Sequence, residues 1–414
     1  MRTDQWRKFD RYWVKAYVPE GLELPSECPV QREVWYFLGV LFWKQLDRER
    51  YSEWREREFT WDEFANLKYD YLNRLPGRWN EVWKWCVKLD LVERTRDYVP
   101  GVRAYGYRLA EPWRGRRHDL QVFSHEQIAK KTRRRERENL GQNATLKNLR
   151  SQLERLTVDM GEYRLYSGQH PHREFYDAQL RTIDDRCLRL TKDRFSGRIH
   201  TNITNLCKPL RAYLRADGEA SMLAEIDIRN SQPLFLGLAA KQKGHVNHDY
   251  LRLCEDGLLY DRMAEQLNMT RDVAKKNVMV MLYADRIYPT PQQRWFEENF
   301  PEVSDYVNNV RAQGGGTMLA KRMQQAERKL IITEVCPRLF RRKKSTFVTT
   351  IHDSLMTKQE DAEMALETVQ EAFSKRGVSP RLDVNVIAAP DMRPTCEVQE
   401  AAAQNVDLCP ALAV

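Results

Sequence analysis

Hydrophobic positions recur at helical spacing in three stretches near the N-terminus. Each stretch predicts a helix, over residues 30–46, 61–72 and 78–89. Two short runs rich in β-branched and aromatic residues follow, at 91–99 and 102–109, and each reads as a strand. Pro100-Gly101 lies between them and favours a turn. The pattern therefore predicts helices followed by a two-stranded wing.

Helices followed by such a wing are typical of a winged-helix domain, which we expect over residues 1–120. Its third predicted helix carries Arg78 and Lys84, and the wing carries Arg94, which makes this domain a candidate for nucleic-acid contact. The alternative is a small structural domain whose tryptophans are core and whose arginines are solvated, because winged helices also bind proteins.

Residues 121–192 change abruptly to high charge, with helical patterning that continues from 124 to 192. Most of this arm is expected to be solvated helix. Its basic cluster contains Arg133 and Arg134, which are candidates for contacts with a phosphate backbone. At the other end of the chain, residues 393–414 have no pattern that indicates packing, and we expect a flexible tail.

A strand–turn–strand pattern with a carboxylate at its tip lies in the C-terminal half. Ser345–Ile351 is β-branched and aromatic, His352, Asp353 and Ser354 interrupt it, and Leu355–Thr357 can return as a second strand. Such a turn holds a carboxylate rigidly, as a metal site requires. An ordinary surface turn is the alternative, because Asp is common in turns.

Two further stretches upstream carry polar groups at fixed positions. Asp227 lies in a short apolar strand that precedes a helix with Pro233 in its first turn. Residues 271–283 predict a helix on which four residues share one stripe, Arg271, Lys275, Met279 and Tyr283. Two carboxylates can hold two magnesium ions, and a cationic stripe can hold a triphosphate, so the three stretches together suggest phosphoryl transfer.

Composition is consistent with a soluble globular protein, and its basic excess suits a polyanionic partner. The 414 residues are 31% charged and 42% hydrophobic, and the formal net charge is +9. No run is long and apolar enough for a transmembrane helix, and the first residues lack the apolar core of a signal peptide. The eight cysteines form no Cys-x-x-Cys pair, which argues against a zinc site and suits the cytoplasm.

The order of these motifs resembles that of the single-subunit RNA polymerases of phages and mitochondria. Arg-x-Val-x-Lys-x-x-Val-Met-x-x-x-Tyr at 271–283 resembles their fingers-helix motif, and Ile351–Thr357 resembles their third palm motif. Asp227 matches the carboxylate of their first palm motif. Arg194–His200 resembles an upstream palm element whose Gly-Arg pair contacts template and primer or transcript.

Family A DNA polymerases share these elements. The sequence Asp-Ile-Arg-Asn-Ser-Gln at 227–232 and the expected strand at 380–387 are similar to theirs. The resemblance covers roughly residues 193–390 and implies a right-hand polymerase core of the α+β class. It implies a palm at 193–232 and 325–392, fingers at about 233–324, and a thumb-like arm at 121–192.

The resemblance also implies roles for single residues. Asp227, Asp353 and the carbonyl of Ile228 would hold two Mg²⁺ ions, which Mn²⁺ can replace. Arg271 and Lys275 would bind the triphosphate, and Lys275 would protonate the departing pyrophosphate. The remaining candidates lie near the nucleotide or the growing 3′ end (Met279, Tyr283, Gln232, His352) or contact nucleic acid (Gly197, Arg198, Gln325).

We therefore expect a template-directed polymerase that uses nucleoside triphosphates, and we favour RNA or primer synthesis in a phage or mobile element. Met279 stands where DNA polymerases usually have an aromatic residue, which favours RNA. Gln232 stands where they keep a bulky residue against the 2′-hydroxyl, which favours a compact DNA polymerase as the alternative. Two further alternatives are a nucleic-acid-binding regulator with a vestigial polymerase core and template-independent extension of a 3′ end. Ala284 departs from the glycine usual after the motif's tyrosine.

Overall fold

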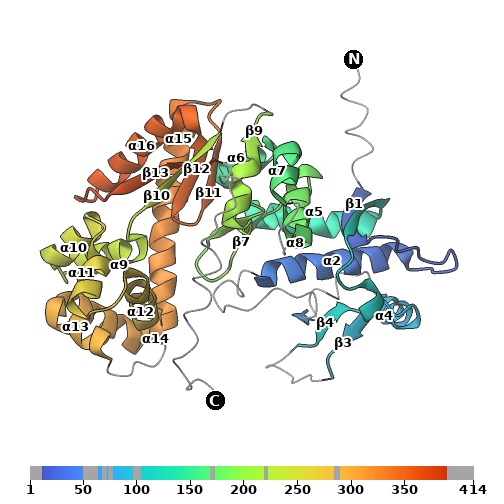
Figure 1. Ribbon diagram of the computed structural model, residues 1–414, viewed down its shortest axis with the longest axis horizontal. Helices are drawn as coiled ribbons and strands as arrows, with labels where there is room; N and C mark the ends of the chain where they lie inside the picture. Colours follow the sequence, from blue (N-terminus) through green and yellow to red (C-terminus); the bar gives the residue numbers. More distant parts are fainter. Residues whose placement is uncertain are drawn as a thin grey trace.

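A four-stranded antiparallel sheet forms the centre of the C-terminal half of the chain (Figure 1). The computed structural model describes residues 12–49, 64–67, 72, 78–96, 104–167, 173–218, 222–283 and 290–388. These residues form an α+β fold, as the sequence predicts. The strands lie in the order β11-β12-β10-β13, with bounds Val348–Ile351, Ser354–Lys358, Leu223–Ile228 and Leu382–Val386. The predicted hairpin at 345–357, the strand at Asp227 and the late strand at 380–387 are thus confirmed.

The two faces of this sheet differ because side chains alternate along β10. Ile226 and Ile228 are buried, whereas Glu225 and Asp227 between them are half-buried. Helix α16 (Ala362–Ser374) packs against β10, β12 and β13, and α15 (Cys336–Arg342) lies beside it. The sheet therefore has an apolar side for packing and carries carboxylates on the other side of β10.

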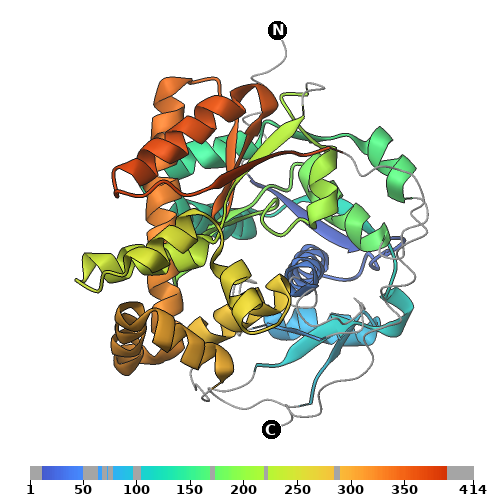
Figure 2. The same cartoon turned by 60° about the vertical axis from the view of Figure 1, so that its left-hand side comes forward.

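A group of helices lies beneath the sheet in Figure 1, coloured yellow to orange. They are α9 (Ser231–Gln242), α10 (His248–Glu255), α11 (Leu259–Gln266), α12 (Arg271–Tyr283), α13 (Pro291–Asn299) and α14 (Pro301–Arg328). The predicted helix at 271–283 is confirmed. Helix α14 is kinked at Gly315, whose φ of 67° suits glycine, and it leads into the π-helical segment η4 (Lys329–Val335). In Figure 2 this long orange helix stands at the left of the molecule.

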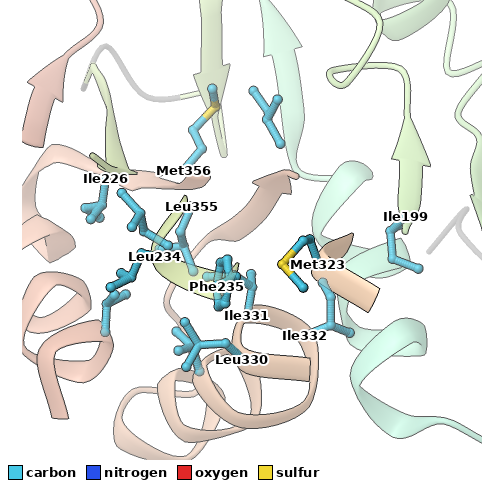
Figure 3. Close-up of a cluster of buried hydrophobic side chains, with 14 of the residues drawn as sticks. Ile199, Ile226, Leu234, Phe235, Met323, Leu330, Ile331, Ile332, Leu355 and Met356 are labelled. Atoms are coloured by element: carbon cyan, nitrogen blue, oxygen red, sulfur yellow. The ribbon is translucent and has the colours of Figure 1, made fainter. Parts of the chain in front are cut away.

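One apolar core joins these helices to the sheet (Figure 3). Phe235 of α9 and Met323 of α14 are buried beside Ile331 of η4 and Leu355 of β12. This packing fixes the N-terminal end of α9 and the C-terminal end of α14 relative to the sheet. The same core contains apolar residues of the charged arm, among them Leu149, Leu153, Leu180 and Ile183.

The N-terminal region contains two small sheets around a long helix. β1 (Trp13–Pro19) pairs with β5 (His118–Ser124), and a second sheet has the order β2-β4-β3. Helices α2 (Gln31–Glu49) and α4 (Trp79–Lys88) confirm two predicted helices, and β3 (Val92–Arg94) and β4 (Gly106–Leu109) confirm two predicted strands. A short helix, η2, spans Glu111–Trp113. Pro100-Gly101 lies outside the described residues.

The prediction of a helix at 61–72 is wrong at residues 65 and 66, which form a strand. Ala65–Asn66 is strand β2, which pairs with Gly106 and Tyr107 of β4. The amide of Leu67 continues the pairing by donating to the carbonyl of Tyr105. A partner strand from forty residues away thus outweighs the local apolar spacing.

The charged arm is mostly solvated over residues 126–140, where only Ile128 and Ala129 are buried, and its later elements contribute to the core. It consists of α5 (Glu126–Leu140), α6 (Ala144–Leu153), β6 (Leu156–Val158), α7 (Met160–Ser167), α8 (Arg173–Asp184) and β7 (Leu190–Lys192). The prediction of helix from 124 to 192 is wrong at β6 and at β7, because both segments pair as strands. β7 pairs with β8 (Ile199–Thr201). β6 pairs with β9 (Leu214–Ala216), which follows η3 (Lys208–Tyr213).

Two of the predicted domain limits can be placed relative to the described residues. The limit between residues 120 and 121 lies inside β5. The expected tail at 393–414 lies outside the described residues. None of the helices that the structure describes has the length and apolar character needed to cross a membrane.

Candidate active site

Asp353 sits in a two-residue turn between β11 and β12. Ile351 pairs with Ser354, so only His352 and Asp353 form the turn. His352 has a φ of 56°, in the left-handed region that tight hairpin turns require. The hydroxyl of Ser231, the first residue of α9, donates a hydrogen bond to the Asp353 carboxylate. The start of α9 and the tip of the hairpin are thereby joined.

Asp227 lies at the same end of the sheet as this turn. Ile226 pairs with Leu355, and the antiparallel register brings the next residues of β10 toward Ser354 and Asp353. Burial raises the pKa of Asp227 to about 6, and the negative charges of Asp353, Glu225 and Asp383 add to the effect. The site therefore holds clustered carboxylates whose charge the protein does not fully compensate.

Two of these carboxylates already have cationic partners. Glu225 lies 3.3 Å from the guanidinium of Arg211, and Asp383 lies 2.5 Å from that of Arg229. Asp353 by contrast accepts a hydrogen bond from the neutral hydroxyl of Ser231. Glu225 and Asp383 are thus each paired with an arginine, whereas no such pair is seen for Asp227 or Asp353 among the described residues.

Asp227 and Asp353 fit the preference of Mg²⁺ for oxygen ligands. Mg²⁺ is usually bound by one or two carboxylates, with substrate phosphates and water completing its shell. Among the described residues, no three His, Cys, Asp or Glu side chains form a ready-made metal site. Asp227 and Asp353 thus supply two carboxylates, a number of protein ligands that Mg²⁺ commonly takes.

A chain of hydrogen bonds runs beside these carboxylates through four side chains, which come from three helices and the turn before β8. Arg198, just before β8, donates through Nε to Glu327 at 2.9 Å and also through Nη2. Gln232 of α9 donates from Nε2 to the same carboxylate at 2.6 Å. The hydroxyl of Tyr283, the last residue of α12, donates to Oε1 of Gln232 at 2.6 Å. Three predicted site residues, Arg198, Gln232 and Tyr283, are therefore linked.

Glu327 is the centre of this chain and is 1% exposed. Burial raises its pKa to about 7, although the adjacent Arg198 opposes that rise. Burial also raises the pKa of the Tyr283 phenol, so Tyr283 keeps its proton near neutral pH. The charge of Asp353 contributes to both rises, which indicates that this chain lies close to the hairpin turn.

The other predicted residues of α12 lie progressively farther from Tyr283. Met279 is half-buried one turn away, and Lys275 and Arg271 are exposed. Along the helix axis they are about 12 Å and about 18 Å from Tyr283. Arg271 lies 3.3 Å from Asp261 of α11. The cations thus form an exposed extension of the site rather than part of its buried centre.

The residues predicted to contact nucleic acid lie in the turn between β7 and β8, on α14 and on α5. Gly197 is in the turn between β7 and β8, with a φ of 78°, and a Cβ there would come within 3.1 Å of the Arg328 side chain. Gln325 is exposed on α14, two residues before Glu327. Arg133 and Arg134 lie on α5, which packs against β7. The ring of His352 lies 5.5 Å from that of His200 of β8.

Glu327 and Ser231 were not among the residues predicted from the sequence. Glu327 lies in a charged run, yet Leu319, Met323, Glu327 and Ile331 recur every four residues along one helical stripe. A carboxylate on an apolar stripe is a signal of a buried, partnered charge. Ser231 gives no comparable signal, because its role depends on the distant Asp353.

Comparisons with known proteins leave the chain without an assigned family. No family model and no curated protein matches it. Among solved structures, the POL domain of Pol1 from M. smegmatis, in complex with DNA primer-template and dNTP, aligns with a TM-score of 0.30 and 15% sequence identity. The alignment covers 56% of this chain and 55% of that chain, so the chain spans about half of that structure.

Proposed function

We propose that the protein is a template-directed nucleotidyltransferase that joins nucleoside triphosphates into a nucleic acid. The observation that carries the proposal is the meeting of Asp227 and Asp353, where burial, together with the charges of the neighbouring carboxylates, raises the pKa of Asp227 to about 6. A folded protein gains nothing in stability from such a cluster, whereas a site for Mg²⁺ and phosphates requires it.

The proposal gives each candidate residue a role, whether it lies in the carboxylate cluster or on the exposed part of α12. Asp227, Asp353 and the Ile228 carbonyl would hold two Mg²⁺ ions, which when bound activate the attacking 3′-hydroxyl and stabilise the leaving oxygen. Ser231 orients the Asp353 carboxylate through its hydrogen bond. Lys275 and Arg271 attract the triphosphate, and Lys275 protonates the leaving pyrophosphate. Residues 193–392 would then be palm and fingers, 121–192 a thumb-like arm, and 1–120 a winged-helix-like domain.

An incorporation assay tests the function directly. The purified chain is given Mg²⁺, a set of ribo- or deoxyribonucleoside triphosphates, and a DNA or RNA template with or without a primer. Extension that follows the template sequence is expected. Extension that ignores the template would indicate a terminal transferase, and binding without extension would indicate a regulator.

The basic residues of α5 provide a second expectation. If Arg133 and Arg134 contact phosphates, replacing both by alanine should weaken binding to duplexes of any sequence. It should also make the logarithm of the binding constant fall less steeply with the logarithm of the salt concentration, by about one to two in the slope. Fluorescence anisotropy at several salt concentrations measures this slope. Arg252→Ala, at an exposed arginine of α10, is the control. An unchanged slope in the double variant would assign this part of α5 to structure alone.

The Tyr283 phenol gives an expectation for sugar selection. It lies on the same helix stripe as the cations, and we expect it near the ribose of a triphosphate that they hold. Losing one hydrogen bond to the 2′-hydroxyl costs about 0.5–1.5 kcal/mol. Tyr283→Phe should therefore lower the preference for ribonucleotides several-fold while total incorporation remains. Competition between ribo- and deoxyribonucleoside triphosphates measures the preference, and an unchanged ratio would remove Tyr283 from sugar selection.

A further inference from the structure

The turn between β7 and β8 holds an aromatic ring out into solvent. Phe195 in this turn is 40% exposed. The Asp193 carboxylate accepts hydrogen bonds from the amide and the hydroxyl of Ser196, at 2.6 and 2.9 Å. It also accepts one from the amide of Gly197 at 3.2 Å. Because these bonds fix the backbone next to Phe195, the ring is exposed by a well-ordered turn and not by a loose loop.

The surroundings of the ring are basic. Lys192 and Arg194 are exposed, and no carboxylate among the described residues forms an ion pair with either of them. A Cβ added at Gly197 would come within 3.1 Å of the Arg328 side chain and 3.2 Å of that of Lys192, so these two cations lie against the turn. The basic helix α5 packs against β7. The excess of positive charge around the ring suits a polyanion.

The same turn adjoins the candidate active site. Arg198, its last residue, donates to Glu327 in the hydrogen-bond chain beside the carboxylates. The ring of His200, in β8, lies 5.5 Å from that of His352, which precedes Asp353 in the hairpin turn. A nucleic-acid end held at the carboxylates therefore lies close to the exposed ring.

Exposure of one apolar side chain indicates no ligand by itself, because single exposed apolar residues are common on protein surfaces. The setting of Phe195 is more specific, since phosphates can contact the surrounding cations while a base stacks on the ring. Bases within a duplex already stack on both of their faces. The ring therefore fits a base that is not paired within a duplex.

We propose that Phe195 stacks on an unpaired base of the nucleic acid, at the point where the duplex held by the active site ends. The inference rests on the proposed function, since it takes a nucleic-acid end to lie at Asp227 and Asp353. It goes further by naming the group that is recognised, the face of an unpaired base. It also names a residue to which the resemblance gives no role, because in this turn the resemblance concerns Gly197 and Arg198.

Phe195→Ala tests this stacking with three fluorescent probes, a blunt DNA duplex and the same duplex with a 5′ or a 3′ overhang. The affinity for at least one overhang duplex, measured by anisotropy without nucleotides, should fall about five- to 150-fold, as expected for the loss of one base–aromatic stack. The affinity for the blunt duplex should stay close to that of the wild-type protein. The overhang whose binding weakens identifies the strand that carries the unpaired base.

Three further variants separate stacking from charge and from general packing. Phe195→Tyr keeps the ring and should bind as the wild-type protein does, whereas Phe195→Leu lacks an aromatic face and should behave like Phe195→Ala. Arg194→Ala removes a charge, so it should weaken all three probes alike and reduce the salt dependence. Trp13→Ala, at a ring on β1 that is 45% exposed, is the matched control and should bind all three probes normally.

The outcomes distinguish the inference from the proposed function. Unchanged binding of both overhang duplexes by Phe195→Ala would overturn the inference, as would an equal loss on the blunt duplex or normal binding by Phe195→Leu. Incorporation by the wild-type protein would still uphold the function in each of these cases. A loss confined to overhang duplexes, without any incorporation by the wild-type protein, would uphold the inference and reject the function. Absence of binding by the wild-type protein to all three probes would overturn both.

Discussion

Replacing Asp227 or Asp353 by asparagine is expected to reduce nucleotide incorporation by about 10³-fold or more. Either change removes a charged oxygen ligand from the cluster, and several kcal/mol of transition-state stabilisation depend on a correctly held metal ion. Incorporation with saturating Mg²⁺ measures the loss. Asp256→Asn, at an exposed site paired with Arg252, is the control and should retain full activity. Activity close to that of the wild-type protein in either variant would reject the two-carboxylate assignment.

The same Asp227→Asn variant should be more stable than the wild-type protein without metal, and the gain should depend on pH. The pKa of Asp227 is about 6 in the folded protein and about 4 in an unfolded chain. Its folded form therefore binds the proton more tightly, and stability is lost as the pH rises from about 4 through about 6. Asparagine removes this loss, so urea unfolding with a chelator should give a gain on the order of 1–3 kcal/mol at pH 8 and little gain at pH 4. An equal gain at both pH values would mean that Asp227 is not titrating as described.

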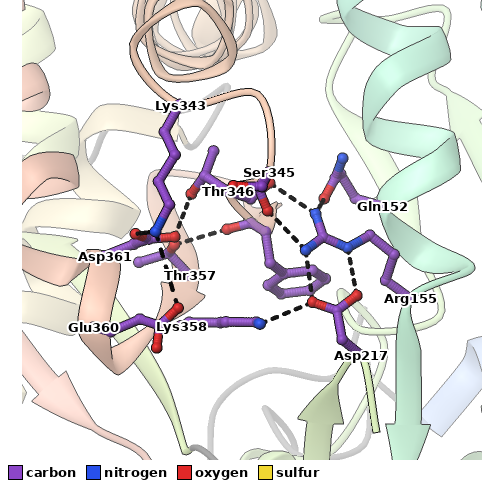
Figure 4. Close-up of polar contacts among 11 residues, drawn as sticks. Gln152, Arg155, Asp217, Lys343, Ser345, Thr346, Thr357, Lys358, Glu360 and Asp361 are labelled. Carbon is purple, nitrogen blue, oxygen red and sulfur yellow. Dashed lines mark hydrogen bonds and ion pairs between the residues drawn. The ribbon is translucent and has the colours of Figure 1, made fainter. Parts of the chain in front are cut away.

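Arg155→Ala is expected to lower the free energy of unfolding by about 2–4 kcal/mol. The Arg155 guanidinium, between α6 and β6, donates to both oxygens of Asp217, at 2.7 and 2.6 Å (Figure 4). It also donates to the carbonyls of Ser345 and Thr346, each at 2.8 Å. These two residues lead into β11, so one side chain fastens the charged arm to the strand that carries the Asp353 turn. Urea denaturation measures the change.

The geometry of this contact predicts how two further variants behave. Arg155→Lys should recover little of the loss, because an ammonium cannot reproduce the planar fork that reaches a carboxylate and two carbonyls together. Arg252→Ala, whose guanidinium is 81% exposed in its pair with Asp256, should change stability by less than about 0.5 kcal/mol. A loss as small as this in Arg155→Ala would show that the arm is not held by this contact.

The ion pair between Arg155 and Asp217 makes the free energy of unfolding depend on pH. Hydrogen bonds from Arg155, and then from Lys358 at 2.9 Å, hold the pKa of Asp217 well below its usual range. A lowered folded-state pKa contributes stability above the unfolded value of about 4, and this contribution is lost as the pH falls. Wild-type stability should therefore drop more steeply in acid than that of Arg155→Ala. Parallel acid curves would show that Arg155 does not lower the pKa of Asp217.

Local elements of the fold could be predicted from the sequence, because apolar spacing and turn residues act over a few positions. The helix at 271–283 and the turn that begins at His352 were found in this way and are confirmed, although Ser354 belongs to β12 and not to the turn. The strand at Ala65–Asn66 and the strand at Leu190–Lys192 were missed. Both are three residues or shorter, and they exist because a partner strand elsewhere supplies their hydrogen bonds.

The same distinction between local pattern and long-range contact applies to the candidate site. The sequence by itself determined which chemical groups are available and in which order, since Asp227, Gln232, Tyr283 and Asp353 each stand in a recognisable local pattern. Only the tertiary structure decided that Ser231 holds Asp353 and that Glu327 joins Arg198 to Gln232. Glu327 is separated from these two partners by 129 and 95 residues, and its burial comes from the packing of α14 against α9. Local periodicity carries no information about contacts over such separations, so the charge that orients the site became visible only in the folded chain.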